Sequence, residues 1–153
     1  QLLPSGIEYA EQPVSAADVG ALRRLRALVP VAADEALGRP GGAEAVLDGE
    51  EGPAADVVIL KLPVLGGVLA ALRLAARARA RGVAAVVTSA LDGALLRAAG
   101  AHLALLLGPG RHHHGLATGA LLVEDPGGYR LAAGALHVPD APGLGIAPEL
   151  LGW

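Results

Sequence analysis

Four side chains that could take part in chemistry follow short apolar segments at regular intervals. Glu11, Asp34, Lys61 and Ser89 are separated by 23, 27 and 28 residues. Each interval is about the length of one strand, one helix and their loops, so each residue is expected to end a strand of a parallel sheet. The carboxyl ends of parallel strands meet at one edge of a sheet, where α/β proteins place their active sites. The spacing therefore predicts two carboxylates, an ammonium and a hydroxyl at one edge.

Two carboxylates beside a lysine have a direct chemical interpretation. The oxygen ligands of Glu11 and Asp34 suit Mg²⁺ better than zinc. A divalent ion next to the Lys61 ammonium can stabilise the negative charge that develops when a proton is removed beside a carboxylate. The alternative is that both acids cap loops and that Lys61 is their ion-pair partner, since charge clusters are often only structural. The spacing leaves both interpretations open.

The stretch that positions Lys61 is the clearest strand in the chain. Residues 57–60 are apolar, rich in β-branched side chains and without alternation, which is typical of a strand buried on both faces. Lys61 follows at its carboxyl end, and Pro63 with the pair Gly66 and Gly67 predicts a turn directly after it. Residues 68–81 then read as a helix, which completes one strand, loop and helix unit.

The rest of the chain repeats this alternation. Further strands are expected over 7–10, 29–33, 83–87 and the last part of 115–123, and further helices over 16–28 with Ser15 as the cap, 43–47 and 91–107. A turn at 126–128 precedes a final extended segment at 129–138. The pattern fits a doubly wound sheet or part of a (β/α) barrel. The barrel is favoured because every strand delivers a functional group and no glycine-rich phosphate loop follows the first strand, which also disfavours nucleotide binding.

Composition narrows the classes of partner. The chain has 153 residues, of which 53% are hydrophobic, enough for the core of one domain. A net charge of −3 argues against nucleic acid and against an anionic membrane surface. No apolar run approaches the roughly 20 residues that span a bilayer. Because there is no cysteine and no visible targeting signal at the start, a cytoplasmic protein is expected.

Three segments, in this order and at these spacings, resemble the second half of an enolase-superfamily barrel. They are Ile7-Glu8-Tyr9-Ala10-Glu11-Gln12-Pro13, Val31-Ala32-Ala33-Asp34-Glu35 and Leu60-Lys61-Leu62-Pro63-Val64-Leu65-Gly66-Gly67. The likeness is to the subgroup of muconate cycloisomerase and o-succinylbenzoate synthase. Three further stretches, at 87–92, 115–119 and 142–146, are most similar to o-succinylbenzoate synthases. The ordered set covers nearly the whole chain.

The resemblance implies a TIM-like (β/α)7β barrel of which this chain holds about strands 4 to 8, over residues 1–138, followed by an irregular carboxyl-terminal tail at 139–153. It implies that Glu11 and Asp34 are the second and third Mg²⁺ ligands. Lys61 would face the substrate from the side opposite the proton-abstracting base and would stabilise the enediolate. It also implies that a second group of residues lies near the succinyl group or its carboxylate: Ser89, Gly115 and Thr118.

The activity that the resemblance implies is the dehydration of 2-succinyl-6-hydroxy-2,4-cyclohexadiene-1-carboxylate to o-succinylbenzoate, a step of menaquinone biosynthesis. The substrate would thus be a small carboxylate. Within the same subgroup the alternatives are an N-acylamino acid racemase, a dipeptide epimerase or a cycloisomerase. A different alternative is a non-catalytic half-barrel module.

This sequence also departs from the family pattern. Family enzymes carry an amino-terminal capping domain, a Lys-x-Lys motif that supplies the general base, and an aspartate that is the first metal ligand. The chain has no counterpart of these, so we expect the other half of the barrel, or another copy, to cover its open strand edges.

The triplet His112-His113-His114 stands apart from these motifs. It could bind a transition metal or lie over the active site. A solvated loop is favoured, because adjacent imidazoles cannot all converge on one ion.

Overall fold

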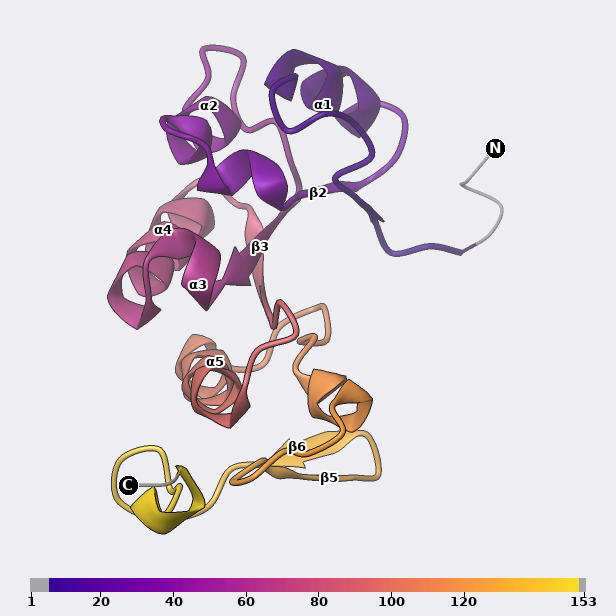
Figure 1. The fold of residues 1–153 in the computed structure, drawn as a ribbon. Coiled ribbons are helices and arrows are strands. Elements are labelled where there is room, and N and C mark those ends of the chain that lie inside the picture. The colour runs from indigo at the N-terminus through magenta and orange to yellow at the C-terminus, as the bar shows by residue number, and fades with distance from the viewer. Residues whose placement is uncertain (1–5, 152–153) are drawn as a thin grey trace.

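The computed structural model describes residues 6–151. Four strands form a parallel sheet in the order of the chain: β1 (Ala10–Glu11), β2 (Val31–Ala33), β3 (Val57–Lys61) and β4 (Ala84–Thr88). Helices connect them, and in Figure 1 the chain winds from α1 (Val19–Arg26) near the top to the hairpin of β5 (Arg130–Ala132) and β6 (Ala135–His137) near the bottom. Parallel strands in consecutive order with helical crossovers form the wall of a (β/α) barrel, as predicted.

The helices between the strands mostly lie where the sequence places them. They are α1 (Val19–Arg26), α2 (Gly42–Leu47), α3 (Leu62–Leu65), α4 (Val68–Ala80) and α5 (Ala94–Leu107). In the part of the chain that the structure describes, three 3₁₀ turns accompany them: η2 (Glu35–Gly38), η3 (Ala117–Leu121) and η4 (Pro148–Leu151). Among the described residues, no helix combines the length and apolar character needed to cross a bilayer.

Strand β3 is buried on both faces, as its lack of alternation predicted. Val58 and Leu60 belong to the larger apolar cluster, which the helices cover. Val57 and Ile59 belong to a smaller cluster on the opposite face. Because successive side chains of a strand point to opposite faces, the smaller cluster marks the interior face of the barrel wall.

The start of helix α1 corrects one prediction. Ser15 is not its cap; the Ser15 hydroxyl accepts a 3.4 Å hydrogen bond from the Ala17 N–H in the preceding turn. Asp18 caps the helix instead, because its carboxylate accepts a 2.7 Å hydrogen bond from the Ala21 N–H. A carboxylate also complements the positive end of the helix dipole, which favours Asp18 over the serine.

Two local predictions around the strand ends were wrong. Leu62–Leu65 is a short helix, α3, rather than part of a turn, because proline is tolerated in the first turn of a helix, where its missing N–H has no partner to lose. The strand expected in the last part of 115–123 is absent. Only Gly115 forms a parallel bridge, to Thr88, and the chain then turns into η3. Val123 is fully exposed, so nothing there pairs with it.

The extended segment at 129–138 forms an antiparallel hairpin of β5 (Arg130–Ala132) and β6 (Ala135–His137). The connecting residues Ala133 and Gly134 both have positive φ, at 50° and 76°, as a two-residue hairpin turn requires. Within the predicted tail, Pro148–Leu151 forms a 3₁₀ turn, and residues 152–153 lie outside the described part. The boundary between a barrel segment 1–138 and a tail 139–153 stays a prediction.

The histidine triplet makes specific contacts instead of lying free in a loop. His112 Nδ1 lies 2.8 Å from the Glu8 carboxylate, and its ring packs edge-on against Tyr9. The hydrogen bond to His112 lowers the pKa of Glu8. His114 Nδ1 accepts a 3.0 Å hydrogen bond from the N–H of Val87 in β4. Two of the three imidazoles thus tie the loop before Gly115 to the start of the sheet and to β4.

We predict that His114 makes stability depend on pH. Burial, with a smaller effect of His113, lowers the pKa of His114 below its ordinary value of 6.5. The unfolded chain then binds more protons than the native one, so the free energy of unfolding falls as the pH drops through about 6.5 toward the lower native pKa. Thermal melts from about pH 8 to about pH 5 should show this loss. Replacing His114 with Gln, whose carbonyl can accept the same bond, should flatten the profile; an unchanged profile would contradict the assignment.

Candidate active site

The three charged residues singled out in the sequence lie on one face of the sheet. Side chains in a strand alternate with a period of two, so Glu11, Asp34 and Lys61 share a face with the residue two positions before each. Those residues belong to, or pack against, the interior cluster: Tyr9, Ala32 and Ile59. The alternation therefore directs all three charged groups to the interior face, at the carboxyl ends of three adjacent parallel strands.

Asp34 and Lys61 are directly paired. Lys61 Nζ donates a hydrogen bond to Asp34 Oδ2, and only 5% of the Asp34 side chain and 22% of the Lys61 side chain are exposed. Lys61 is the single lysine of the chain. Burial disfavours its charged form, but the hydrogen bond to Asp34 and the charges of Asp34 and Glu11 outweigh this and raise the pKa of Lys61. The side chain is therefore an ammonium ion at neutral pH.

Glu11 completes this group. Loss of hydration and the negative charge of Asp34 raise the pKa of Glu11, although Lys61 acts in the opposite direction. Two carboxylates that disfavour each other's ionisation are stabilised when a cation binds between them, and oxygen donors suit Mg²⁺. The donor set therefore fits a magnesium ion. Residues 6–151 contain no group of three or more His, Cys, Asp or Glu side chains that could hold a metal, so the described part supplies two ligands.

The residues predicted to lie near the substrate also come together, next to Lys61. Lys61 is the register partner of Thr88, and Ser89 follows Thr88 in the chain. The hydroxyls of Ser89 and Thr118 lie 2.5 Å apart. Gly115 lies against the end of β4, because its N–H donates to the Val87 carbonyl at 2.9 Å and its carbonyl accepts from the Ser89 N–H at 3.0 Å.

Gly115 is tightly enclosed at this position. A Cβ atom there would lie 3.0 Å from Cγ2 of Thr88, closer than ordinary van der Waals contact. The glycine thus allows the segment leading to Thr118 to lie directly against the end of β4.

Sequence reasoning missed Thr88. Its side chain shares the interior face with Lys61 by the same alternation. The Thr88 hydroxyl is buried and has no hydrogen-bond partner in the described part of the chain. Thr88 lies two residues after Val86 of the interior cluster, and the two-residue period of a strand places it on the same face.

Sequence reasoning also missed Gln12, which follows Glu11. Its side-chain carbonyl accepts hydrogen bonds from the backbone N–H groups of Asp34, at 2.9 Å, and Ala36, at 3.2 Å. The only sequence signal was its place between Glu11 and Pro13.

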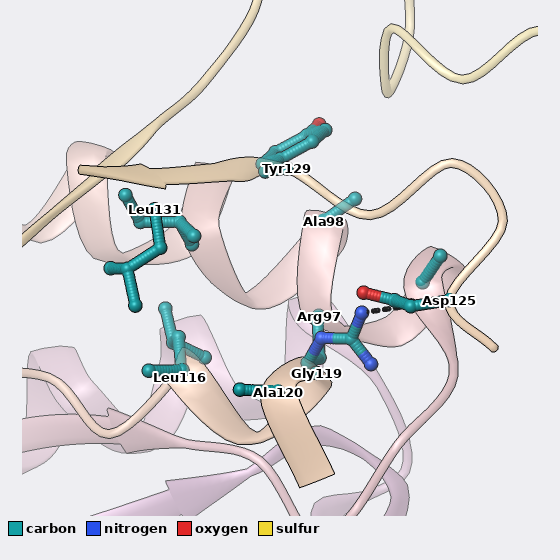
Figure 2. Close-up of a pocket in the computed structure, with 11 residues that line it drawn as sticks. Arg97, Ala98, Leu116, Gly119, Ala120, Asp125, Tyr129 and Leu131 are labelled. Atoms are coloured by element: carbon teal, nitrogen blue, oxygen red, sulfur yellow. Dashed lines mark hydrogen bonds and ion pairs between the residues drawn. The ribbon is translucent and has the colours of Figure 1, made fainter. Parts of the chain in front are cut away.

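A separate cavity of about 70 Å³ lies between α5, η3 and the β5–β6 hairpin and contains none of the predicted site residues. Figure 2 shows Arg97 pointing across it toward Asp125. Arg97, only 5% exposed, donates hydrogen bonds to the Asp125 carboxylate and the Asp92 carbonyl. A Cβ on Gly119 would clash with both side chains of the ion pair. The pair anchors the segment after Thr118 to α5.

Known proteins are similar to this chain over nearly its whole length. An o-succinylbenzoate synthase of Mycobacterium marinum is 41% identical over 155 residues, covering 96% of this chain and 46% of that protein. A muconate lactonizing enzyme from Pseudomonas fluorescens, solved with muconolactone, superposes with a TM-score of 0.86 at 33% identity, covering 99% of this chain and 42% of that one. The L-Ala-D/L-Glu epimerase from Bacillus subtilis superposes with a TM-score of 0.82 at 31% identity, covering 95% and 41%.

The chain spans about half the length of the curated relatives it matches. The family model described as enolase C-terminal domain-like matches residues 1–150. These similarities and the parallel sheet confirm the prediction of a carboxyl-terminal half of a TIM-like barrel. The chain therefore belongs to the enolase C-terminal domain-like family.

Proposed function

We propose that the protein containing this chain is an o-succinylbenzoate synthase. It would dehydrate 2-succinyl-6-hydroxy-2,4-cyclohexadiene-1-carboxylate to o-succinylbenzoate in menaquinone biosynthesis. The observation that carries the proposal is the group formed by Glu11, Asp34 and Lys61 on the interior face, in a chain 41% identical to a synthase of this name. The expected cytoplasmic location remains a prediction.

Glu11 and Asp34 are the proposed ligands of a magnesium ion. Enolase-superfamily membership generally implies the use of Mg²⁺ and of small carboxylate substrates. When bound, the ion would supply positive charge. This charge would stabilise the negative charge that builds up on the substrate carboxylate as the proton on the neighbouring carbon leaves. The two acids approach from neighbouring strands, β1 and the end of β2, so the sheet brings the two ligand segments side by side.

Lys61 is proposed to stabilise the enediolate from its own side of the substrate. Its ammonium is oriented by Asp34 and only partly exposed, so it is directed at the interior before substrate binds. A charge that needs no reorientation in a site shielded from water stabilises a developing anion more strongly than a solvated one. The proton-abstracting base would come from the part of the barrel outside this chain.

Ser89, Gly115 and Thr118 are proposed to line the substrate end of the site, together with Thr88. The hydrogen bond between the two hydroxyls holds η3 against the end of β4, beside Lys61. The buried Thr88 hydroxyl has no partner within residues 6–151, and we propose that it hydrogen-bonds a substrate oxygen.

Thr88 yields a prediction in which stability and affinity change in opposite directions. Thr88→Val removes a buried hydroxyl that has no partner, so the variant should gain on the order of 1 kcal/mol in unfolding free energy, while the KM for the substrate rises. Chemical denaturation and steady-state kinetics measure the two effects. Thr118→Val is the matched comparison, since it removes a hydroxyl that is hydrogen-bonded to Ser89 and should lose stability. Equal stability changes in both variants would contradict the assignment of the Thr88 hydroxyl.

A racemase or epimerase of the same subgroup is the second candidate, because the epimerase from Bacillus subtilis has the same fold over most of this chain. In that reaction Lys61 would act as a base on the second face of the substrate. The full-length protein should therefore be offered the cyclohexadiene, N-acylamino acids, dipeptides and muconate in deuterated water. The proposed synthase forms o-succinylbenzoate fastest. Solvent deuterium in both enantiomers of an amino acid substrate, without dehydration, would replace it with the second candidate.

The two edge strands of the sheet, β1 and β4, indicate what this chain must pair with. Among residues 6–151, β1 pairs only with β2, and beyond β4 the sheet continues only through the bridge at Gly115. An unpaired strand edge is a template for further pairing. We propose that the remaining strands of the barrel cover these edges. If the full-length protein neither binds a divalent metal nor turns over any of the substrates above, a non-catalytic half-barrel module becomes the better interpretation.

A further inference from the structure

The side chain of Gln12 connects the two proposed metal ligands. Gln12 follows Glu11 directly, and its amide oxygen accepts hydrogen bonds from the N–H groups of Asp34, at 2.9 Å, and Ala36, at 3.2 Å. Its amide nitrogen donates to the carbonyl of Val14 at 3.2 Å. Both ends of the amide are thus used, one on the loop after β2 and the other on its own loop.

The backbone of Gln12 is held in a costly conformation. Its φ is +36°, a region that non-glycine residues seldom occupy, and the next residue is Pro13. Strained residues persist where the surrounding contacts determine them, and they gather at functional sites. Here the backbone N–H of Gln12 is held at 2.9 Å by the Ala32 carbonyl of β2, and the strained turn directs the side chain to the Asp34 loop.

The contacts continue from Asp34 to Lys61. The Asp34 backbone has φ −124° and ψ −90°, outside the regular regions, and its N–H is paired with the Gln12 amide. The Asp34 carboxylate accepts from Lys61. β2 ends at Ala33, so the amide of Gln12 adds a contact that holds the Asp34 backbone in the position from which its carboxylate meets Lys61.

We propose that Gln12 is a positioning residue that sets the relative placement of the carboxylates of Glu11 and Asp34 for a divalent cation. The inference rests on the proposed metal site. Groups that orient metal ligands typically change metal affinity by 10-fold to 100-fold when they are removed. Gln12 itself touches neither the metal nor the substrate.

Three substitutions of Gln12 test separately the hydrogen-bonding groups of its side chain, the length of the side chain and the accepting oxygen. Gln12→Met keeps the length of the side chain and removes both hydrogen-bonding groups. Gln12→Asn keeps the amide but shortens its reach by one methylene, and asparagine tolerates positive φ better than glutamine, so the backbone is not further strained. Gln12→Glu keeps an oxygen that can accept from the two N–H groups. Ser15→Ala, at an exposed hydroxyl in the same loop, is the control.

The experiment uses the full-length protein and has two readouts. Hydrogen exchange of the metal-free protein, resolved at the amides of Asp34 and Ala36, reports the contact itself. Mn²⁺ binding, followed by electron paramagnetic resonance, reports the site without any catalytic step. We expect Gln12→Met and Gln12→Asn to lose protection at both amides and to bind Mn²⁺ about tenfold or more weakly. Gln12→Glu should keep the protection, and Ser15→Ala should match the wild type in both measurements.

The outcomes distinguish this inference from the proposed function. Wild-type Mn²⁺ affinity in the Met or Asn variant would overturn the positioning role, even if amide protection were lost. Unchanged protection at Asp34 and Ala36 would overturn the contact. If Gln12→Met does not fold, the Asn and Glu pair still decides the question. If the wild type binds no Mn²⁺, the metal site itself is wrong, and the positioning role is overturned with it.

Discussion

Lys61→Met is expected to lower kcat by about a hundredfold to a thousandfold in the full-length enzyme. The variant keeps the length and apolar stem of the side chain but removes the charge proposed to stabilise the enediolate. Loss of one preorganised group of this kind typically costs that factor. Steady-state turnover of the cyclohexadiene at saturating Mg²⁺ measures the effect. The matched control is Arg73→Met, which removes one positive charge from an exposed position on α4 and should leave kcat unchanged.

The same substitution should reveal the pairing with Asp34. Without Lys61, the nearly buried Asp34 carboxylate has lost its cation. Removing one partner of such a pair destabilises a protein strongly, here by on the order of 3 kcal/mol in the metal-free state. A divalent cation bound to Asp34 would restore the missing positive charge, so added Mg²⁺ should recover most of the melting temperature. Turnover by Lys61→Met within a few-fold of the wild type would contradict the role assigned to this lysine.

Asp34→Asn is expected to have an effect of similar size through the metal. The neutral amide keeps the shape of the side chain but removes a ligand charge and the partner of Lys61. We expect Mg²⁺ affinity to fall at least a hundredfold and turnover at ordinary Mg²⁺ concentration to become undetectable. Calorimetric titration of Mg²⁺ into the full-length protein measures the affinity directly.

Glu35→Gln provides the matched control for Asp34→Asn. Glu35 is the next residue in the chain and loses the same charge, but its side chain is exposed at the start of η2. It should bind Mg²⁺ within a few-fold of the wild type. If both variants lose Mg²⁺ affinity equally, the loss comes from the change in local net charge, and Asp34 is not a ligand.

The strand ends could be predicted because they depend on local patterns. The apolar run before Lys61 and the regular spacing of Glu11, Asp34 and Lys61 follow from the length of a strand and helix unit. That these three residues share one face follows from the two-residue period of a strand. The grouping of Glu11, Asp34 and Lys61 could therefore be predicted from their spacing in the sequence.

Other parts of the site depend on contacts that sequence spacing does not encode. The amide of Gln12 reaches a loop 22 residues further along the chain, and His112 meets Glu8 at a separation of 104 residues. The strand predicted within 115–123 ends at Gly115, because only that residue lies against β4 before the chain turns. Thr88 was not predicted as a site residue, because the strand was expected to end at residue 87, one residue before β4 ends.

The most direct test is the Mg²⁺ dependence of o-succinylbenzoate formation by the full-length protein. The protein is stripped with a chelator, assayed with the cyclohexadiene, and assayed again after Mg²⁺ is restored, for the wild type and for Lys61→Met. We predict no turnover without metal, full recovery in the wild type, and recovery of Mg²⁺ binding without turnover in the variant. Product formation that persists without metal, or that Lys61→Met supports at the wild-type rate, would contradict a site built on Glu11, Asp34 and Lys61.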